Sequence, residues 1–328
     1  MSTNKQKIGV DVGGTFTDFS CQLSDGRRLG FKIPSTPGDP SQAVIEGVTE
    51  LIENYNVDPS QIELFAHGTT VATNAVLERK GATVGLITTS GFRDVLEIGR
   101  QMRQQMYSVR LEPETPVFLA PGRRRFGVIE RVGPDGEIIT PLDESSVLEA
   151  LTSLQIQKVS SVAVVLLFSF MNSVHEKRIR EIILDNNPDI LVSLSSEVDP
   201  VFREYERTVV TTFDAYIKPT VDQYLSNLSN ALEDKKVGAS LQIMQSRGGL
   251  AGAETARIRP VRLFLSGPAG GVMGALSEGK INNFKDLITV DIGGTSCDIA
   301  LISDAKPLIR QEGVIDKYLV RVPMVDVN

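Results

Sequence analysis

One eight-residue pattern occurs twice in this chain of 328 residues. Residues 11–18 read Asp-Val-Gly-Gly-Thr-Phe-Thr-Asp, and residues 291–298, 280 positions later (291 minus 11), read Asp-Ile-Gly-Gly-Thr-Ser-Cys-Asp. Each copy lies between two short apolar runs, which is typical of a strand, a tight glycine turn and a second strand. Because the two copies share both residues and context, the chain is predicted to contain two matching β-hairpins.

The tips of these hairpins carry the residue types that bind phosphate and a divalent cation. Glycines allow close approach of the backbone and positive φ, and they point N–H groups at an anion. Asp11 and Asp291, at strand ends, suit a hydrated cation, because hard cations prefer carboxylate and water oxygens. A single copy would favour a plain glycine turn, whereas two facing copies could grip a polyphosphate. The predicted phosphate contacts are Gly13, Gly14, Thr15, Thr17, Gly293, Gly294, Thr295 and Ser296.

Length and composition limit the class of protein. A chain of this length is too long for one ordinary core, so two domains are expected. The net charge of −7 argues against broad binding to nucleic acid or to an anionic membrane. The longest apolar run, residues 162–170, is too short to span a bilayer. No signal peptide is expected. The chain has only two cysteines, Cys21 and Cys297, so a disulfide framework is not expected, which fits a cytoplasmic protein.

Apolar periodicity predicts alternating strands and helices. The predicted strands cover 8–10, 18–23, 28–33, 62–66, 84–88 and 159–168, and the predicted helices cover 41–55, 71–79, 143–154 and 173–186. This alternation predicts an α/β fold with largely parallel or mixed sheets flanked by helices. Residues 99–125 interrupt the pattern as a long surface excursion, and residues 126–140 are predicted to form a hairpin.

The second half of the chain is predicted to begin with a long helical region over residues 200–233, divided at Pro219. Strands at 240–244 and 261–265 follow, and residues 266–271 begin a helix. The expected domains are residues 1–200 and residues 201–328.

Residues 266–271, Ser-Gly-Pro-Ala-Gly-Gly, form a second candidate anion site. Free N–H groups at a helix N-terminus suit an anion, and Pro268 fits the first turn. Gly267, Gly270 and Gly271 are therefore candidate ligand contacts. The alternative, that small residues here allow a helix and a strand to pack closely, is equally favoured.

The two histidines of the chain are interpreted differently. His67 lies in a predicted strand-to-helix turn, residues 67–70, where it could bond a phosphate or a carbonyl or act as a general acid or base. The alternative is a buried histidine satisfied by the backbone. His175 lies among charged residues at a helix start and is predicted to be solvated. The segment 203–207 is predicted to be an ion-paired helix surface, with ligand contacts as the alternative.

Beyond the two hairpins, further segments strengthen a resemblance to a known family. The chain resembles the A-type, ATP-binding subunit of the hydantoinase/oxoprolinase family, within the actin, Hsp70 and sugar-kinase ATPase superfamily. The segments that carry the resemblance are 11–18, 66–74, 91–100, 195–197, 203–207, 243–246, 265–271 and 291–295. They occur through the whole chain in the family's order.

The resemblance implies a duplicated RNase-H-like fold whose second domain is incomplete, since family chains are considerably longer. It implies ATP and Mg²⁺ between the hairpins, with Asp11 and Asp291 as catalytic residues that hold Mg²⁺ through water. It also favours His67 as a catalytic residue. The implied substrate contacts are Thr69, Thr70, Asn74, Arg203, Gln245 and Ser246.

The implied activity is ATP-dependent hydrolysis of a cyclic amide such as hydantoin, 5-oxoproline or a lactam. Phosphorylation by ATP would activate the carbonyl oxygen, and a B-type subunit would complete a hetero-oligomer. A ketone carboxylase subunit of the same family and a small-molecule kinase are the alternatives. A non-enzymatic actin-like assembly module is favoured least.

Overall fold

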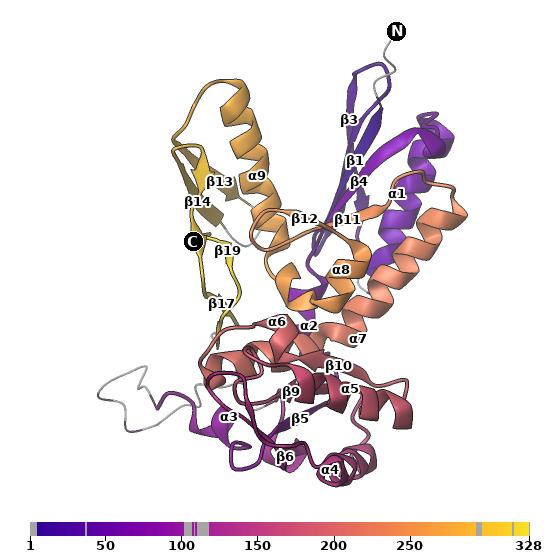
Figure 1. Cartoon of the computed structure of the whole chain (residues 1–328). Coiled ribbons are helices and arrows are strands. Elements are labelled where there is room, and N and C mark those ends of the chain that lie inside the picture. Colours follow the sequence, from indigo (N-terminus) through magenta and orange to yellow (C-terminus); the bar gives the residue numbers. More distant parts are fainter. Residues whose placement is uncertain are drawn as a thin grey trace. The chain divides into compact units, whose positions relative to one another are not determined.

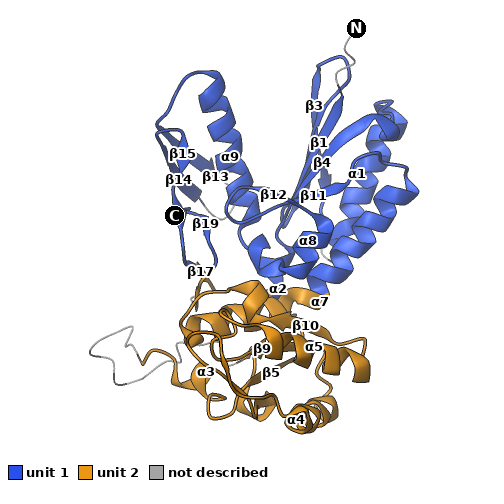
Figure 2. Ribbon diagram, in the orientation of Figure 1, with its two compact units in different colours: residues 1–75, 220–313, 322–328 blue, residues 76–219, 314–321 orange. Residues whose placement is uncertain are grey.

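The computed structural model describes residues 5–36, 38–101, 107, 109, 118–292, 297–316 and 318–327. These residues form two compact units. Unit 1 comprises residues 1–75, 220–313 and 322–328, and unit 2 comprises residues 76–219 and 314–321 (Figure 2). The chain enters each unit more than once. The predicted domains 1–200 and 201–328 are a different division of the chain and stay a prediction.

Unit 1 contains a six-stranded mixed sheet in the order β12-β11-β4-β1-β2-β3 (Figure 1). β1 pairs with β2 and β2 with β3 in antiparallel fashion, whereas β4 runs parallel to β1 on its other edge. The strands are β1 (Gln6–Val12), β2 (Phe16–Gln22), β3 (Arg28–Pro34), β4 (Ile62–Thr69), β11 (Leu241–Met244) and β12 (Leu250–Gly252). The predicted strands at 8–10, 18–23 and 28–33 are confirmed.

Helix α1 (Pro40–Asn54) packs against this sheet. The Asp39 side chain caps it by accepting the Ser41 N–H, which satisfies one of the free donors of the first turn. Val44, Val48 and Leu51 recur with the helical period, and all three are buried. The helix predicted over 41–55 is therefore confirmed. The short elements η1 (Pro59–Gln61), α2 (Val71–Leu77), α8 (Ala253–Ile258) and η3 (Pro260–Leu263) connect the strands.

The second hairpin of unit 1 has the same strand pairing as the first. β13 (Leu287–Ile292) pairs antiparallel with β14 (Cys297–Ser303), and β15 (Lys306–Pro307) extends the sheet. Helix α9 (Ser266–Ile281) lies along one face of this sheet (Figure 1), and its buried side chains share a core with those of β14. Both predicted hairpins are thus confirmed as strand pairs. The short strands β16 (Ile309–Arg310), β17 (Gly313–Ile315), β18 (Tyr318–Val320) and β19 (Met324–Val325) follow.

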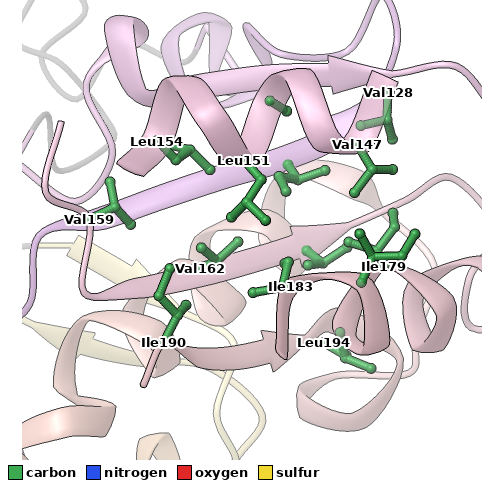
Figure 3. Close-up of a cluster of buried hydrophobic side chains, with 14 of the residues drawn as sticks. Val128, Val147, Leu151, Leu154, Val159, Val162, Ile179, Ile183, Ile190 and Leu194 are labelled. Atoms are coloured by element: carbon green, nitrogen blue, oxygen red, sulfur yellow. The ribbon is translucent and has the colours of Figure 1, made fainter. Parts of the chain in front are cut away.

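Unit 2 is built on a four-stranded parallel sheet in the order β10-β9-β5-β6. Every residue of its two central strands is buried, which is typical of a parallel sheet that is covered on both faces. Figure 3 shows the aliphatic core between this sheet and its helices. The strands are β5 (Val84–Thr89), β6 (Arg125–Val128), β9 (Ser161–Val165) and β10 (Leu191–Leu194); the helices and turns are α3 (Val95–Ile98), η2 (Gly122–Arg124), α4 (Glu144–Ile156), α5 (Val174–Asn186) and α6 (Ser195–Val198).

Three local predictions are wrong. Helix α7 (Glu204–Asp234) continues through Pro219 instead of dividing there, because buried side chains on both sides of the proline hold its turns in place. Residues 260–263 form η3 instead of a strand, since Pro260 fixes a helical φ at its start. Only β7 (Arg131–Val132) and β8 (Ile138–Thr140) form the hairpin predicted over 126–140, because β6 joins the parallel sheet.

Most of the predicted excursion over 99–125 lies outside the described residues. Among the residues that the structure describes, no helix is both long enough and apolar enough to cross a membrane.

Candidate functional site

The first hairpin places two carboxylates directly across from each other. Asp11 on β1 pairs with Asp18 on β2, and Asp291 pairs with Asp298 in the same register on the second hairpin. Directly opposed like charges destabilise a strand pair unless a cation compensates them. Lys32 compensates Asp18 at 2.7 Å. The ion pairs formed by the described residues include neither Asp11 nor Asp291.

The tip of the first hairpin is a tight turn. The Gly13 N–H donates to the Phe16 carbonyl at 3.0 Å, and a Cβ on Gly13 would lie 3.0 Å from that same oxygen. Neither Gly13 nor Gly14 has positive φ. The expectation of positive φ is therefore wrong here, and close backbone approach is the reason for Gly13. A Cβ on Gly14 would meet no atom within 4 Å, so the tip opens to solvent.

Thr17 supports this tip from inside the protein. Its side chain is fully buried, and its hydroxyl lies 3.1 Å from the Ser35 hydroxyl. Ser35 in turn donates to the Gly13 carbonyl at 2.8 Å. This arrangement suits a structural brace for the turn. Direct phosphate binding by Thr17, Gly13, Gly14 and Thr15 stays a prediction. The corresponding contacts at Gly293, Gly294, Thr295 and Ser296 lie outside the described residues.

Two elements approach the Asp11 carboxylate. Gly68 of β4 is the register partner of Asp11, and a Cβ there would lie 2.7 Å from Asp11 Oδ1. The second element is the first turn of α9, where a Cβ on Gly267 would lie 3.6 Å from the same oxygen. Ser266 fixes the start of α9 by donating to the Thr69 carbonyl at 2.9 Å. The predicted helix start at residues 266–271 is therefore confirmed.

No side chain caps the N-terminus of α9, and its N-cap residue, Leu265, has a left-handed conformation. The first N–H groups of a helix have no acceptor within the helix and suit an anion. Gly267, Gly270 and Gly271 line a cavity of about 480 Å³, together with Asp11, Asp18, Gly68 and Asp291. The structure thus brings the two predicted metal-site carboxylates and the α9 glycines to one cavity within unit 1.

The electrostatics of this cavity suit a bound cation. The pKa of Asp11 is raised, first by partial desolvation and then by the negative charges of Asp18 and Asp291. A cation would relieve this repulsion. Among the described residues there is no cluster of three or more His, Cys, Asp or Glu side chains that could hold a metal directly. Asp11 and Asp291 line one cavity, where two carboxylates and water could hold a cation; this site stays a prediction.

His67 lines the same cavity, but it is fully buried. Its Nε2 lies 2.6 Å from the Tyr224 hydroxyl of α7. Burial lowers the pKa of His67 to about 4, and the Val10 backbone acts in the opposite direction. The imidazole is therefore neutral at pH 7, which favours hydrogen bonding over general acid catalysis. Its catalytic role stays a prediction.

The predicted substrate contacts fall in different places. The Thr70 hydroxyl donates to the Val12 carbonyl at 3.2 Å and accepts from the Asn74 amide at 3.2 Å. Thr69 and Ser246 are buried, and the Ser246 hydroxyl donates to the Pro323 carbonyl at 2.8 Å. The remaining two are Gln245, which is buried in unit 1, and Arg203, which belongs to unit 2. Substrate contact by all six residues stays a prediction.

Two predictions of solvated side chains in unit 2 are wrong. His175 is buried, and its Nδ1 lies 2.8 Å from Glu130 Oε2. Arg207 is also fully buried, although segment 203–207 was expected to be a helix surface. Its guanidinium donates to the Ser169 hydroxyl at 3.0 Å and to the Leu166 carbonyl. Charged residues in these short segments mark an internal polar network, which sequence periodicity does not distinguish from a solvated face.

Sequence reasoning missed Gly68, Ser35 and Tyr224. Gly68 matters because strand pairing places it beside Asp11, which is 57 positions away (68 minus 11). Ser35 and Tyr224 reach the tip and His67 only after folding. The glycine in the segment 66–74 was the one local signal, since a glycine inside a strand often marks a close approach.

The chain matches two sequence families that together cover most of its length. Residues 7–186 match the hydantoinase/oxoprolinase N-terminal region, and residues 207–328 match hydantoinase/oxoprolinase. The chain is 34% identical to the caprolactamase alpha subunit of Pseudomonas jessenii, over 100% of this chain and 48% of that subunit. It is 31% identical to 5-oxoprolinase 1 of Arabidopsis thaliana, over 99% of this chain and 27% of that protein. The chain thus spans half or less of the length of these relatives.

Two solved structures are also similar to this chain over nearly its whole length. An acetone carboxylase structure without nucleotide matches with a TM-score of 0.87 and 29% identity, over 99% of this chain and 48% of that chain. The ATP-dependent caprolactamase from Pseudomonas jessenii matches with a TM-score of 0.84 and 33% identity, over 98% of this chain and 47% of that chain. The mixed sheets flanked by helices therefore form an actin-like ATPase fold, as expected. The chain belongs to the hydantoinase/oxoprolinase family.

Proposed function

We propose that this chain is the ATP-binding part of an ATP-dependent hydrolase of cyclic amides. The observation that carries the proposal is the cavity in which Asp11, Asp291 and the glycine-rich start of α9 meet. Carboxylates next to free helix N–H groups can accommodate a metal and a polyphosphate together. The relatives add the reaction class, since the similar proteins include an ATP-dependent caprolactamase and a 5-oxoprolinase.

The residues of the cavity would each hold a different part of the bound metal and nucleotide. Asp11 and Asp291 would hold Mg²⁺ through water, which neutralises the repulsion that raises the pKa of Asp11. The tip at Gly14 and Thr15 would hold phosphate oxygens, and the matching tip of the second hairpin would do the same. The α9 glycines would add backbone donors. Positioning and charge neutralisation supply most of the catalysis in such phosphoryl transfers.

Transfer of the terminal phosphoryl group of ATP to the amide oxygen would make the amide carbon more electrophilic. Water would add to that carbon, the ring C–N bond would break, and a second water would release phosphate from the resulting acyl phosphate. A cyclic amide resists direct attack by water, so this activation gives a physical reason for coupling its hydrolysis to ATP. Neutral His67 would help to orient side chains at the cavity wall through its hydrogen bond with the Tyr224 hydroxyl. A B-type subunit would act with this chain in a hetero-oligomer, in keeping with the subunit names of its relatives. The cytoplasm is the proposed location.

A ketone carboxylase subunit is the second candidate. The observation that favours it is the close structural match to acetone carboxylase. The two candidates share the ATP site and differ in the second reactant, which is water in one case and bicarbonate in the other.

The test is phosphate release from ATP by the protein that contains this chain, assembled with its partner subunit. Hydantoin, 5-oxoproline, caprolactam, and acetone with bicarbonate are supplied in turn. Stimulation by a cyclic amide without bicarbonate is expected. Asp11→Asn and Asp291→Asn should each raise the barrier by about 2 to 4 kcal/mol, as the loss of an electrostatic stabiliser does elsewhere.

Asp234→Asn is the matched control, because Asp234 is an exposed carboxylate at the end of α7. It should leave stimulated turnover unchanged. Full turnover in both hairpin variants would refute the two-carboxylate site. Accumulation of phosphorylated product in step with ADP would identify a kinase instead.

A further inference from the structure

The start of helix α9 is fixed by the side chain of its first residue. Ser266 is 1% exposed, and its hydroxyl donates to the Thr69 carbonyl at 2.9 Å and accepts the Thr69 N–H at 3.3 Å. One side chain thus bonds both backbone groups of the last residue of β4. Strand β11 pairs with β4 only as far as His67. Ser266 therefore satisfies backbone groups that lie beyond the end of that ladder.

The residue before Ser266 is held in a conformation that is unfavourable for a residue with a Cβ. Leu265, the N-cap of α9, has φ 54° and ψ 34°, which lies in the left-handed region. Such a conformation persists where the surrounding structure fixes it. The Leu265 N–H donates to the Thr73 hydroxyl of α2 at 3.4 Å, and Ser266 bonds the end of β4. These two contacts therefore hold the start of α9 in place against the strain.

The first turn of α9 offers two free backbone donors. Pro268 has no N–H, and the Ala269 N–H donates to the carbonyl of the N-cap residue at 3.4 Å. The N–H groups of Ser266 and Gly267 remain, and they have no acceptor among the described residues. Gly267 is the donor next to the candidate metal site, because a Cβ on it would lie 3.6 Å from Asp11 Oδ1.

A backbone donor beside a carboxylate suits a ligand that carries charges of both signs. Gly267 and Asp11 line the same cavity. A metal-bound nucleotide presents a matching pair of groups, which are a cation for the carboxylate and an anionic phosphate oxygen for the N–H. Because hydrogen bonds weaken steeply with distance and angle, the Gly267 N–H can serve this ligand only while the start of α9 keeps its place.

We propose that Ser266 is a positioning residue for phosphoryl transfer. Its hydroxyl holds the start of α9 on the end of β4, so that the Gly267 N–H meets a phosphate oxygen of the metal-bound nucleotide beside Asp11. Without this hydroxyl, both backbone groups of Thr69 lose their partner and the strained helix start relaxes away from Asp11. This inference rests on the proposed function, to which it adds a residue that acts through its neighbour.

The test compares Ser266→Ala with the native sequence in the protein that contains this chain, assembled with its partner subunit. Without nucleotide, hydrogen exchange of the peptide over residues 265–271 should be faster in the variant, because α9 is no longer bonded to β4. Mg²⁺ with a non-hydrolysable ATP analogue should slow this exchange in the native protein and change it little in the variant. The variant's kcat/KM for ATP should fall at least about tenfold, as expected when a hydrogen bond to a charged group is lost.

Ser161→Ala is the matched control, because Ser161 is a fully buried serine of unit 2 whose hydroxyl donates to the Leu191 carbonyl at 3.1 Å. It should leave the exchange of residues 265–271 and kcat/KM unchanged. Thr73→Val is the second variant, because it removes the other contact of the helix start and keeps the shape of the side chain. It should reduce the nucleotide-dependent protection in the same direction as Ser266→Ala.

Native protection and native kcat/KM in Ser266→Ala would overturn this inference and leave the proposed function standing. An equal loss of kcat/KM in Ser161→Ala would also overturn it, because the effect would then follow from the loss of any buried serine hydroxyl. A native assembly that neither turns over ATP nor responds to the analogue would overturn the proposed function and this inference together.

Discussion

Single residues around Asp11 show how closely the candidate site is built. The Asp11 carboxylate is bounded by the backbone of β4 at Gly68 and by the start of α9 at Gly267. A Cβ at Gly68 would lie 2.7 Å from Asp11 Oδ1, so the carboxylate would have to shift. The geometry of the carboxylate therefore depends on a residue that has no functional group.

The first prediction concerns Gly68→Ala. The added methyl should displace the Asp11 carboxylate and reduce ATP turnover by about 10²-fold, since misplacement of a catalytic group by 1 Å can cost that much. Gly30→Ala on β3 is the matched control, because its Cβ would lie at an ordinary contact distance of 3.7 Å from the Phe19 carbonyl and Gly30 does not line the cavity. Equal turnover in the two variants, measured by phosphate release, would contradict the role assigned to Gly68.

The second prediction concerns the pH dependence of stability. The pKa of His67 falls from 6.5 to about 4 on burial, so the unfolded state binds the proton more tightly. The resulting stability is complete above pH 6.5 and is lost as the pH falls towards 4. A shift of this size corresponds to about 3 kcal/mol. His67→Gln should therefore lose less stability than the native chain between pH 7.5 and pH 4.

Urea unfolding of both proteins at several pH values measures this difference. Tyr224→Phe serves as the comparison, because it removes the hydrogen bond to His67 but leaves the imidazole in the protein. It should keep the native pH dependence. Parallel pH profiles for the native chain and His67→Gln would show that His67 retains its ordinary pKa in the folded state.

Among the elements of unit 2, hydrogen bonds of buried polar and charged side chains connect three helices to the end of a parallel strand. Glu176, in the first turn of α5, accepts the Leu166 N–H at 3.0 Å and the Ser195 hydroxyl at 2.6 Å. Ser195 lies 3.0 Å from Ser169, to which Arg207 of α7 donates. This network connects α5, α6 and α7 to the end of β9. A buried charge without its partners is costly.

The third prediction follows from this network. Arg207→Leu should lower the free energy of unfolding by about 3 kcal/mol, since it leaves the buried Glu176 carboxylate uncompensated. Arg178→Leu is the control, because Arg178 pairs with Glu144 and Glu181 at an exposed site of α5. Chemical denaturation should show little change for it, in keeping with exposed ion pairs in general. A similar loss of unfolding free energy in both variants would mean that the burial of Arg207 does not increase its contribution to stability.

At the scale of the whole molecule, local sequence signals predicted most elements correctly. The repeated pattern predicted both hairpins, and the spacing of Val44, Val48 and Leu51 predicted α1. The helix predicted over 143–154 is α4, whose N-cap Asp143 accepts the Ser145 N–H. These features depend on neighbours within a few residues, so a sequence pattern expresses them directly. Errors arose where distant packing decided, as at Pro219 and His175.

The two hairpins, the carboxylates at their tips and the family could be predicted from the sequence, because each is carried by a short run of residues. The folded structure was needed to establish that Gly68 confines the Asp11 carboxylate, that His67 is buried and hydrogen-bonded to Tyr224, and that Arg207 is buried. It was also needed to show that two hairpins with matching sequence differ in exposure, with Val10 4% and Val290 56% exposed. The reason is physical: strand register and burial are set by elements far apart in the chain, and local patterns do not record which of them meet.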